Sequence, residues 1–120
     1  KFEKHAAVER VSYPWLKSHK QHALAKKQMT GGGSTLAITL KGSQEQVFEF
    51  MNALQVIDIS NNLGDSKSLI THPSSTTHRR LSAEVQAAMG ITSATVRLSV
   101  GLENPADLIR DIEQALASVF

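Results

Sequence analysis

Apolar and polar residues alternate in two segments of the chain. Thr35–Leu40 carries an apolar residue at every second position, and Thr95–Val100 repeats the pattern. Side chains of a strand point alternately to its two faces, so each segment predicts a strand with one face in a core. Weaker strand patterns occur at Val8–Tyr13, Val56–Ile57 and Ser68–Thr71. Together these segments predict a sheet.

Four further segments have apolar residues at helical spacing behind a residue that can cap a helix. The four capping residues are Ser18, Ser43, Ser82 and Asn104. Each offers a side-chain oxygen to the free N–H groups of a first helical turn. The outward face of both main strands is small and polar, so we expect the helices to cover only the other face. The predicted fold class is α+β, an antiparallel sheet of about four strands with helices packed on one face.

Composition narrows the function classes. A chain of 120 residues fits a single domain. Its net charge of +2 and scattered basic residues, without interleaved aromatics, give no reason to expect a nucleic-acid partner. No apolar run is long enough for a membrane span. The absence of cysteine excludes disulfides and thiolate metal sites and fits a cytoplasmic protein.

Motifs of common active sites are missing or incomplete. His19 and His22 lie one turn apart, and His72 and His78 bracket a loop, but neither pair has a third ligand at suitable spacing. We therefore expect no metal site and interpret His78 as a residue that fixes loop backbone. The run Gly31–Gly33 precedes a strand and has no Gly-Lys-Ser/Thr after it, which favours a turn over a phosphate loop.

Arg97 is the candidate binding residue. It lies in mid-strand on the face away from the core, between Thr95 and Ser99, whose small side chains would leave room for a partner. A guanidinium presents a planar fork of donors that fits a carboxylate bidentately. Taken alone, the pattern also allows a solvated charge on an open sheet face.

A series of short motifs runs through nearly the whole chain. The motifs are Val11–Pro14, Leu63–Asp65, Thr71–Pro73, Thr76–His78, Gly90–Ile91 and Val96–Glu103. In this order they resemble the C-terminal domain of the cystathionine γ-synthase/methionine γ-lyase family, pyridoxal-phosphate (PLP) enzymes of sulfur amino-acid metabolism. Within that family, Asp58–Asp65 is most similar to the O-succinylhomoserine sulfhydrylase branch.

The resemblance implies that residues 1–120 form the small C-terminal, substrate-binding domain of a fold-type I PLP enzyme. The opening Phe2–His5 has the character of a helix end, and we expect a large PLP-binding domain before it. In the family that domain holds the Schiff-base lysine and the phosphate-binding glycines. We therefore expect no catalytic or cofactor-binding residue here, and an inactive isolated chain. The whole enzyme is expected to be a homotetramer, and the isolated chain to self-associate.

The resemblance also assigns substrate-binding residues. The family's carboxylate-binding arginine falls on Arg97, the threonine of its Thr-His motif on Thr77, and the serine of its Ser-Leu-Gly motif on Asn62. Asn62 departs from the lyase and synthase members and favours the sulfhydrylase branch, and its amide can still donate a hydrogen bond. The implied reaction is γ-replacement on O-succinylhomoserine or O-acetylhomoserine with sulfide, giving homocysteine in methionine biosynthesis.

Two alternatives stay open. The chain could belong to a cystathionine γ-synthase or γ-lyase of the same family. It could also be a free-standing α+β module that binds a ligand or a partner protein and shares only the topology. The two classes differ in what precedes Lys1, because only the enzyme requires a large PLP domain there.

Overall fold

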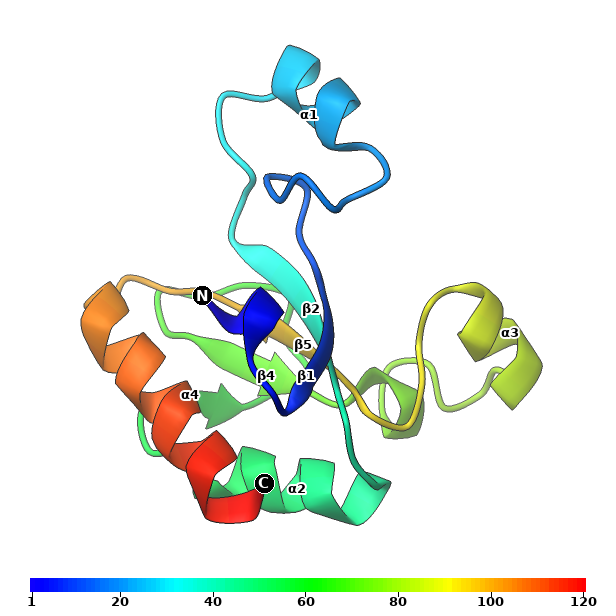
Figure 1. Ribbon diagram of the computed structural model, residues 1–120. Coiled ribbons are helices and arrows are strands. Elements are labelled where there is room, and N and C mark those ends of the chain that lie inside the picture. Colours follow the sequence, from blue (N-terminus) through cyan, green and yellow to red (C-terminus); the bar gives the residue numbers. More distant parts are fainter.

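Five strands form one sheet in the computed structural model, which describes all of residues 1–120 (Figure 1). The elements in chain order are the 3-10 helix η1 (Phe2–Lys4), β1 (Val8–Ser12), α1 (His22–Gln28), β2 (Thr35–Leu40), α2 (Gln44–Ala53), β3 (Asp58–Ile59), β4 (Leu69–Thr71), the 3-10 helix η2 (Pro73–Ser75), α3 (Ala83–Ala88), β5 (Thr95–Ser99) and α4 (Pro105–Val119).

The sheet has the strand order β1-β2-β5-β4-β3. Its pairs are antiparallel except for β3 and β4, which run parallel at one edge. The predicted α+β class with a mainly antiparallel sheet is confirmed, and the parallel edge strand is an addition to it. That edge strand lies at Asp58–Ile59, just after the predicted Val56–Ile57. The backbone N–H groups of Val56 and Ile57 donate to the side chain of Asp111 in α4 and not to a neighbouring strand.

Strand β5 lies at the centre of the sheet, and its two registers fix which residues share a face. Leu98 pairs with Leu36 of β2 and with Ile70 of β4. Arg97 pairs with Ala37 of β2 and with Thr71 of β4. Directly opposed residues point to the same face, so the apolar trio faces one way and Arg97 faces the other.

Helices α2 and α4 cover the apolar face of the sheet (Figure 1). Sixteen buried residues form one core, including Phe50 of α2, Leu116 of α4 and Val96 of β5. In contrast, α1 and α3 stand out from the sheet (Figure 1) and bury only Ala25 and Gln86 respectively. Two of the four predicted helices therefore form the layer expected on one face. None of the helices combines the length and the apolar character needed to cross a bilayer.

Three of the four predicted helix caps are confirmed. Ser43 and Gln46 form a reciprocal capping box, Ser82 accepts a bond from the N–H of Val85, and Asn104 accepts one from Ala106. The fourth was wrong, since α1 begins at His22 rather than after Ser18. Residues before it form tight turns with i→i−3 backbone bonds, and the ring of His19 takes the N–H of Gln21.

Gly101 is packed against backbone and should not tolerate a side chain. A Cβ atom at this position would overlap the backbone of Ser66 and Lys67. We expect Gly101→Ala to lower the free energy of unfolding by about 1–3 kcal/mol, the usual cost of overpacking. Gly31→Ala is the matched control, because nothing lies near its Cβ position, and should change stability by less than about 0.5 kcal/mol. Urea denaturation of both variants checks this, and equal midpoints would contradict it.

Candidate functional site

Arg97 lies half-buried on the sheet face opposite α2 and α4. The sequence suggested that its flanking residues Thr95 and Ser99 would leave open space, but they do not. Thr95 is 3% exposed and lies 3.3 Å, hydroxyl to hydroxyl, from Thr39, whereas Ser99 is 2% exposed and its hydroxyl has no hydrogen-bond partner. Space for a ligand is therefore confined to the end of the Arg97 side chain.

The guanidinium of Arg97 contacts the loop between β3 and β4. Its Nη2 donates to the backbone carbonyl oxygens of Asn61 and Asn62, each at 3.3 Å. It donates no other hydrogen bond, and it is absent from the three ion pairs of the structure. A guanidinium has five N–H donors, so this cation retains three without a partner. A guanidinium with free donors and no acidic partner can bind an anionic ligand.

The carbonyls that Arg97 meets are themselves held in place. The side-chain oxygen of Asn61 accepts a 2.9 Å bond from the hydroxyl of Thr71, the residue paired with Arg97 across the sheet. Thr76 lies 3.1 Å from the same hydroxyl. Asn62 comes to the site through its backbone carbonyl, while its exposed side-chain amide makes no hydrogen bond. The amide of Asn62 is therefore free of partners within the chain, and its expected bond to a substrate carboxylate stays a prediction.

Thr77 lines a polar hollow of about 390 Å³ beside this loop. All six lining residues are polar: Asn61, Ser75, Thr76, Thr77, Arg79 and Arg80. Asn61 belongs both to this hollow and to the Arg97 contact, so the two places adjoin. The hydroxyl of Thr77 bonds the ring of His78 at 2.8 Å and not Arg97. Of the three sequence-derived site residues, the structure joins Arg97 and Asn62 and places Thr77 in the adjoining hollow.

His72, rather than His78, fixes the loop that carries Thr77. It is 2% exposed, and its ring lies 2.7 Å from the hydroxyl of Ser75 and 2.7 Å from the carbonyl oxygen of Ser93. Its own carbonyl accepts from the hydroxyl of Thr76 at 2.7 Å. The interpretation of His78 was therefore wrong, because its ring reaches only the neighbouring Thr77. Sequence reasoning missed this role, although His72 lies within one of the quoted motifs.

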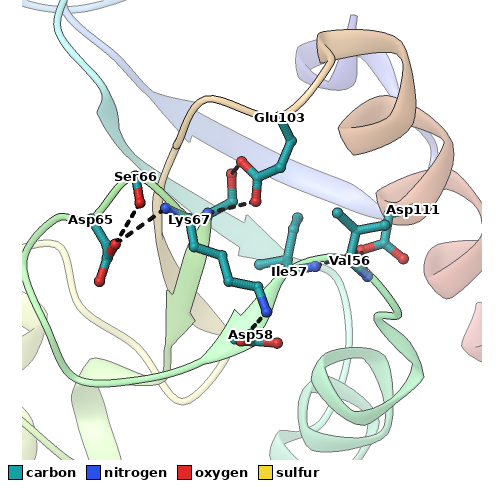
Figure 2. Close-up of polar contacts among 9 residues, drawn as sticks. Val56, Ile57, Asp58, Asp65, Ser66, Lys67, Glu103 and Asp111 are labelled. Carbon is teal, nitrogen blue, oxygen red and sulfur yellow. Dashed lines mark hydrogen bonds and ion pairs between the residues drawn. The ribbon is translucent and has the colours of Figure 1, made fainter.

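A second group of polar contacts anchors the far end of the β3–β4 loop (Figure 2). Glu103 accepts the N–H and the hydroxyl of Ser68, both at 2.8 Å, and these bonds lower the pKa of its carboxyl despite partial burial. Lys67 pairs with Asp58 at 2.5 Å, which raises the pKa of its amine. The backbone N–H of Lys67 and the Ser66 hydroxyl lower the pKa of Asp65. These ionised groups are occupied in holding the loop.

Residues 2–117 match the family described as Cys/Met metabolism PLP-dependent enzyme. The chain belongs to this family. It is 49% identical over 117 residues to O-succinylhomoserine sulfhydrylase of Mycobacterium tuberculosis, covering 94% of this chain and 29% of the relative. It is 45% identical over 116 residues to L-methionine gamma-lyase of Fusobacterium nucleatum subsp. polymorphum, covering 97% and 29%.

A solved structure of the family has the same fold. It is the cystathionine gamma synthase of Xanthomonas oryzae pv. oryzae in complex with aminoacrylate and cysteine. The TM-score is 0.92 at 37% identity, over 98% of this chain and 30% of that one. The chain thus spans under a third of the length of these relatives.

PLP is the cofactor of the family, but the residues of this chain do not fit its covalent attachment. A Schiff-base lysine needs a setting, such as burial or a neighbouring cation, that lowers the pKa of its amine. Every lysine here is exposed, and the amine of Lys67 has a raised pKa beside Asp58. The chain also shows no group of three or more metal-binding side chains. What the described site offers is therefore the binding of an anionic group.

Proposed function

We propose that the chain is the C-terminal substrate-binding domain of a PLP-dependent O-succinylhomoserine sulfhydrylase, with a PLP-binding domain before Lys1. The observation that carries this is Arg97, a half-buried cation whose guanidinium has no acidic partner in the chain. The 49% identity to a sulfhydrylase supports the choice of branch. In the complete enzyme, PLP would supply the electron-sink chemistry, and this domain would orient the amino acid.

Arg97 is poised to exchange one hydrogen bond for a stronger one. Both of its bonds to the loop carbonyls are long, at 3.3 Å, and both come from Nη2. A bidentate carboxylate would use Nη2 together with a second guanidinium nitrogen, so it would displace one carbonyl. A charge-assisted bond to a carboxylate is roughly twice as strong as a neutral bond. The exchange therefore favours the α-carboxylate of an amino acid, with Asn62 and Thr77 alongside.

The homotetramer expected from the resemblance stays part of the proposal. Leu24 and Met29 around α1, and Val85 and Met89 around α3, are each more than 40% exposed. Apolar side chains gathered on projecting segments are typical of protein contacts. We propose that these two segments meet the rest of the enzyme or its other subunits.

A substrate panel on the complete protein tests the proposed function. With sulfide, we expect homocysteine from O-succinylhomoserine, the reaction in keeping with the 49% identity to a sulfhydrylase. Cysteine in place of sulfide, and methionine alone, are the comparison reactions. Cystathionine formation as the main activity would favour the synthase, and breakdown of methionine the γ-lyase. A complete protein that shows no PLP absorbance and no turnover would leave only the free-standing module.

A further inference from the structure

The polar hollow that Thr77 lines is built from two stretches of chain. Asn61 comes from the β3–β4 loop, and the other five lining residues come from η2 and the turns that follow it, at 75–77 and 79–80. The lining includes no apolar residue, and it offers the amide nitrogen of Asn61 and the guanidinium groups of Arg79 and Arg80, while its three hydroxyl groups already bond within the chain. This set of donors is suited to an anion with oxygen acceptors.

The positive charge of the hollow is not neutralised within the chain. Neither Arg79 nor Arg80 takes part in an ion pair or donates a side-chain hydrogen bond, and both residues are exposed. The segment Leu69–Leu81 has no aspartate or glutamate. Two adjacent cations repel one another, and a bound anion would relieve this repulsion. The hollow therefore favours a negatively charged group over a neutral one of equal size.

A buried amide holds the wall of the hollow from beneath. Gln86 of α3 is 7% exposed, and its Nε2 lies within 2.8 Å of the carbonyl oxygen of His78, 3.2 Å of that of Leu81 and 3.4 Å of that of Ser74. The N–H of His78 also donates to the carbonyl of Pro73 at 2.9 Å. The turn carrying both arginines is thus fixed before any ligand arrives, which lowers the entropy cost of binding.

The hollow adjoins the Arg97 site, because Asn61 is a wall of one and a hydrogen-bond acceptor in the other. We propose that the hollow is a second carboxylate subsite, for the terminal carboxylate of a dicarboxylic acyl group esterified to homoserine. This inference rests on the proposed function and deepens it. Arg97 takes the α-carboxylate, while Arg79 and Arg80 take the far end of a succinyl group. An acetyl ester has no such carboxylate and gains nothing from the two arginines.

The test compares two esters in the complete enzyme. Arg79→Ala, Arg80→Ala and the double variant are assayed with sulfide and either O-succinylhomoserine or O-acetylhomoserine. We expect the ratio of kcat/KM for the succinyl ester to that for the acetyl ester to fall by roughly 10- to 100-fold in the double variant. Arg110→Ala is the control, because it removes an exposed guanidinium of α4, far from the hollow in sequence and paired with Asp107. In Arg110→Ala the ratio of the two kcat/KM values should equal that of the wild type.

Other outcomes separate this proposal from the proposed function. Equal losses with both esters, or an unchanged ratio, would overturn the subsite while the sulfhydrylase function stands. If the wild type turns over neither ester, the proposed function fails, and calorimetry then decides on the subsite. Saturable binding of monomethyl succinate that is lost in the double variant would support it. Binding of inorganic phosphate or of neutral dimethyl succinate, but not of monomethyl succinate, would overturn it.

Discussion

Replacing Arg97 by alanine in the complete enzyme should lower kcat/KM by roughly 30- to 5,000-fold, or about 2–5 kcal/mol. The guanidinium has no acidic partner in the chain, so its full charge is available to a substrate carboxylate. Without it, the carboxylate would enter the site unpaired. Steady-state kinetics with O-succinylhomoserine and sulfide measure the loss. Arg97→Lys should recover only part of the activity, because an ammonium cannot form two parallel bonds.

Arg10 provides a matched control for this substitution. It lies on β1 of the same sheet, is exposed, and also donates through Nη2 to a backbone carbonyl, that of Gly90 at 3.0 Å. Arg10→Ala should change kcat/KM by less than about threefold, as for other solvated charges. If Arg97→Ala and Arg97→Lys behave like Arg10→Ala, Arg97 is a solvated sheet charge. The assignments of Asn62 and Thr77, which were placed with it, would then lose their support.

Asp111→Ala should destabilise the fold by about 3–5 kcal/mol. Asp111 of α4 is 4% exposed, and its carboxylate accepts the backbone N–H groups of Gln55, Val56 and Ile57 at 2.7–3.0 Å. Figure 2 shows Asp111 beside Val56 and Ile57. Removal would leave these donors without a partner, at a place that is partly buried for Gln55 and Val56 and buried for Ile57. Chemical denaturation measures the change. Asp111→Asn, which keeps one acceptor oxygen, should have a smaller effect of about 1–3 kcal/mol.

The same carboxylate makes stability depend on pH. Burial tends to raise the pKa of Asp111, but the three backbone donors and Gln114 outweigh it and hold that pKa below its ordinary value. This contribution is complete above about pH 4 and is lost as pH falls through the lowered pKa. In Asp111→Ala the acid-induced loss of stability should therefore be shallower. Glu113→Gln, which disrupts only the exposed pair with Lys1, is the control and should cost less than about 1 kcal/mol. An equal loss of stability in Asp111→Ala and Glu113→Gln would contradict the prediction.

The parts of the fold that could be predicted are those where side-chain type decides the outcome. Alternation located the strand that carries Arg97, and the short polar side chains of Ser43 and Asn104 located two helix starts. The start of α1 could not be predicted in this way. The hydroxyl of Ser18 is suited to a cap, but a run of tight backbone turns occupies the chain up to Gln21.

The candidate site also divides into features that could be predicted from side-chain type and features that could not. Arg97 could be found because it lies in mid-strand between two small hydroxyl residues, and the resemblance gave it a partner. The hydrogen bonds that hold Arg97 could not be predicted, since Asn61 and Asn62 accept them through backbone carbonyls, which any residue possesses. The burial of Thr95 and Ser99 was also hidden, because it depends on chain packed against them from elsewhere in the fold. In the sequence, Arg79 and Arg80 could be recognised only as two adjacent basic residues, without a binding role.

The central position of β5 has a consequence for folding fidelity. Arg97 is aligned at once with Ala37 and Thr71, the residues opposite it on the two neighbouring strands. A slip of β5 by one residue would turn every side chain of the strand to the other face. Arg97 would then enter the apolar layer beneath α2 and α4, where the cost of an unpaired charge is several kcal/mol. The arginine proposed to recognise substrate therefore also disfavours misaligned pairing while the sheet assembles.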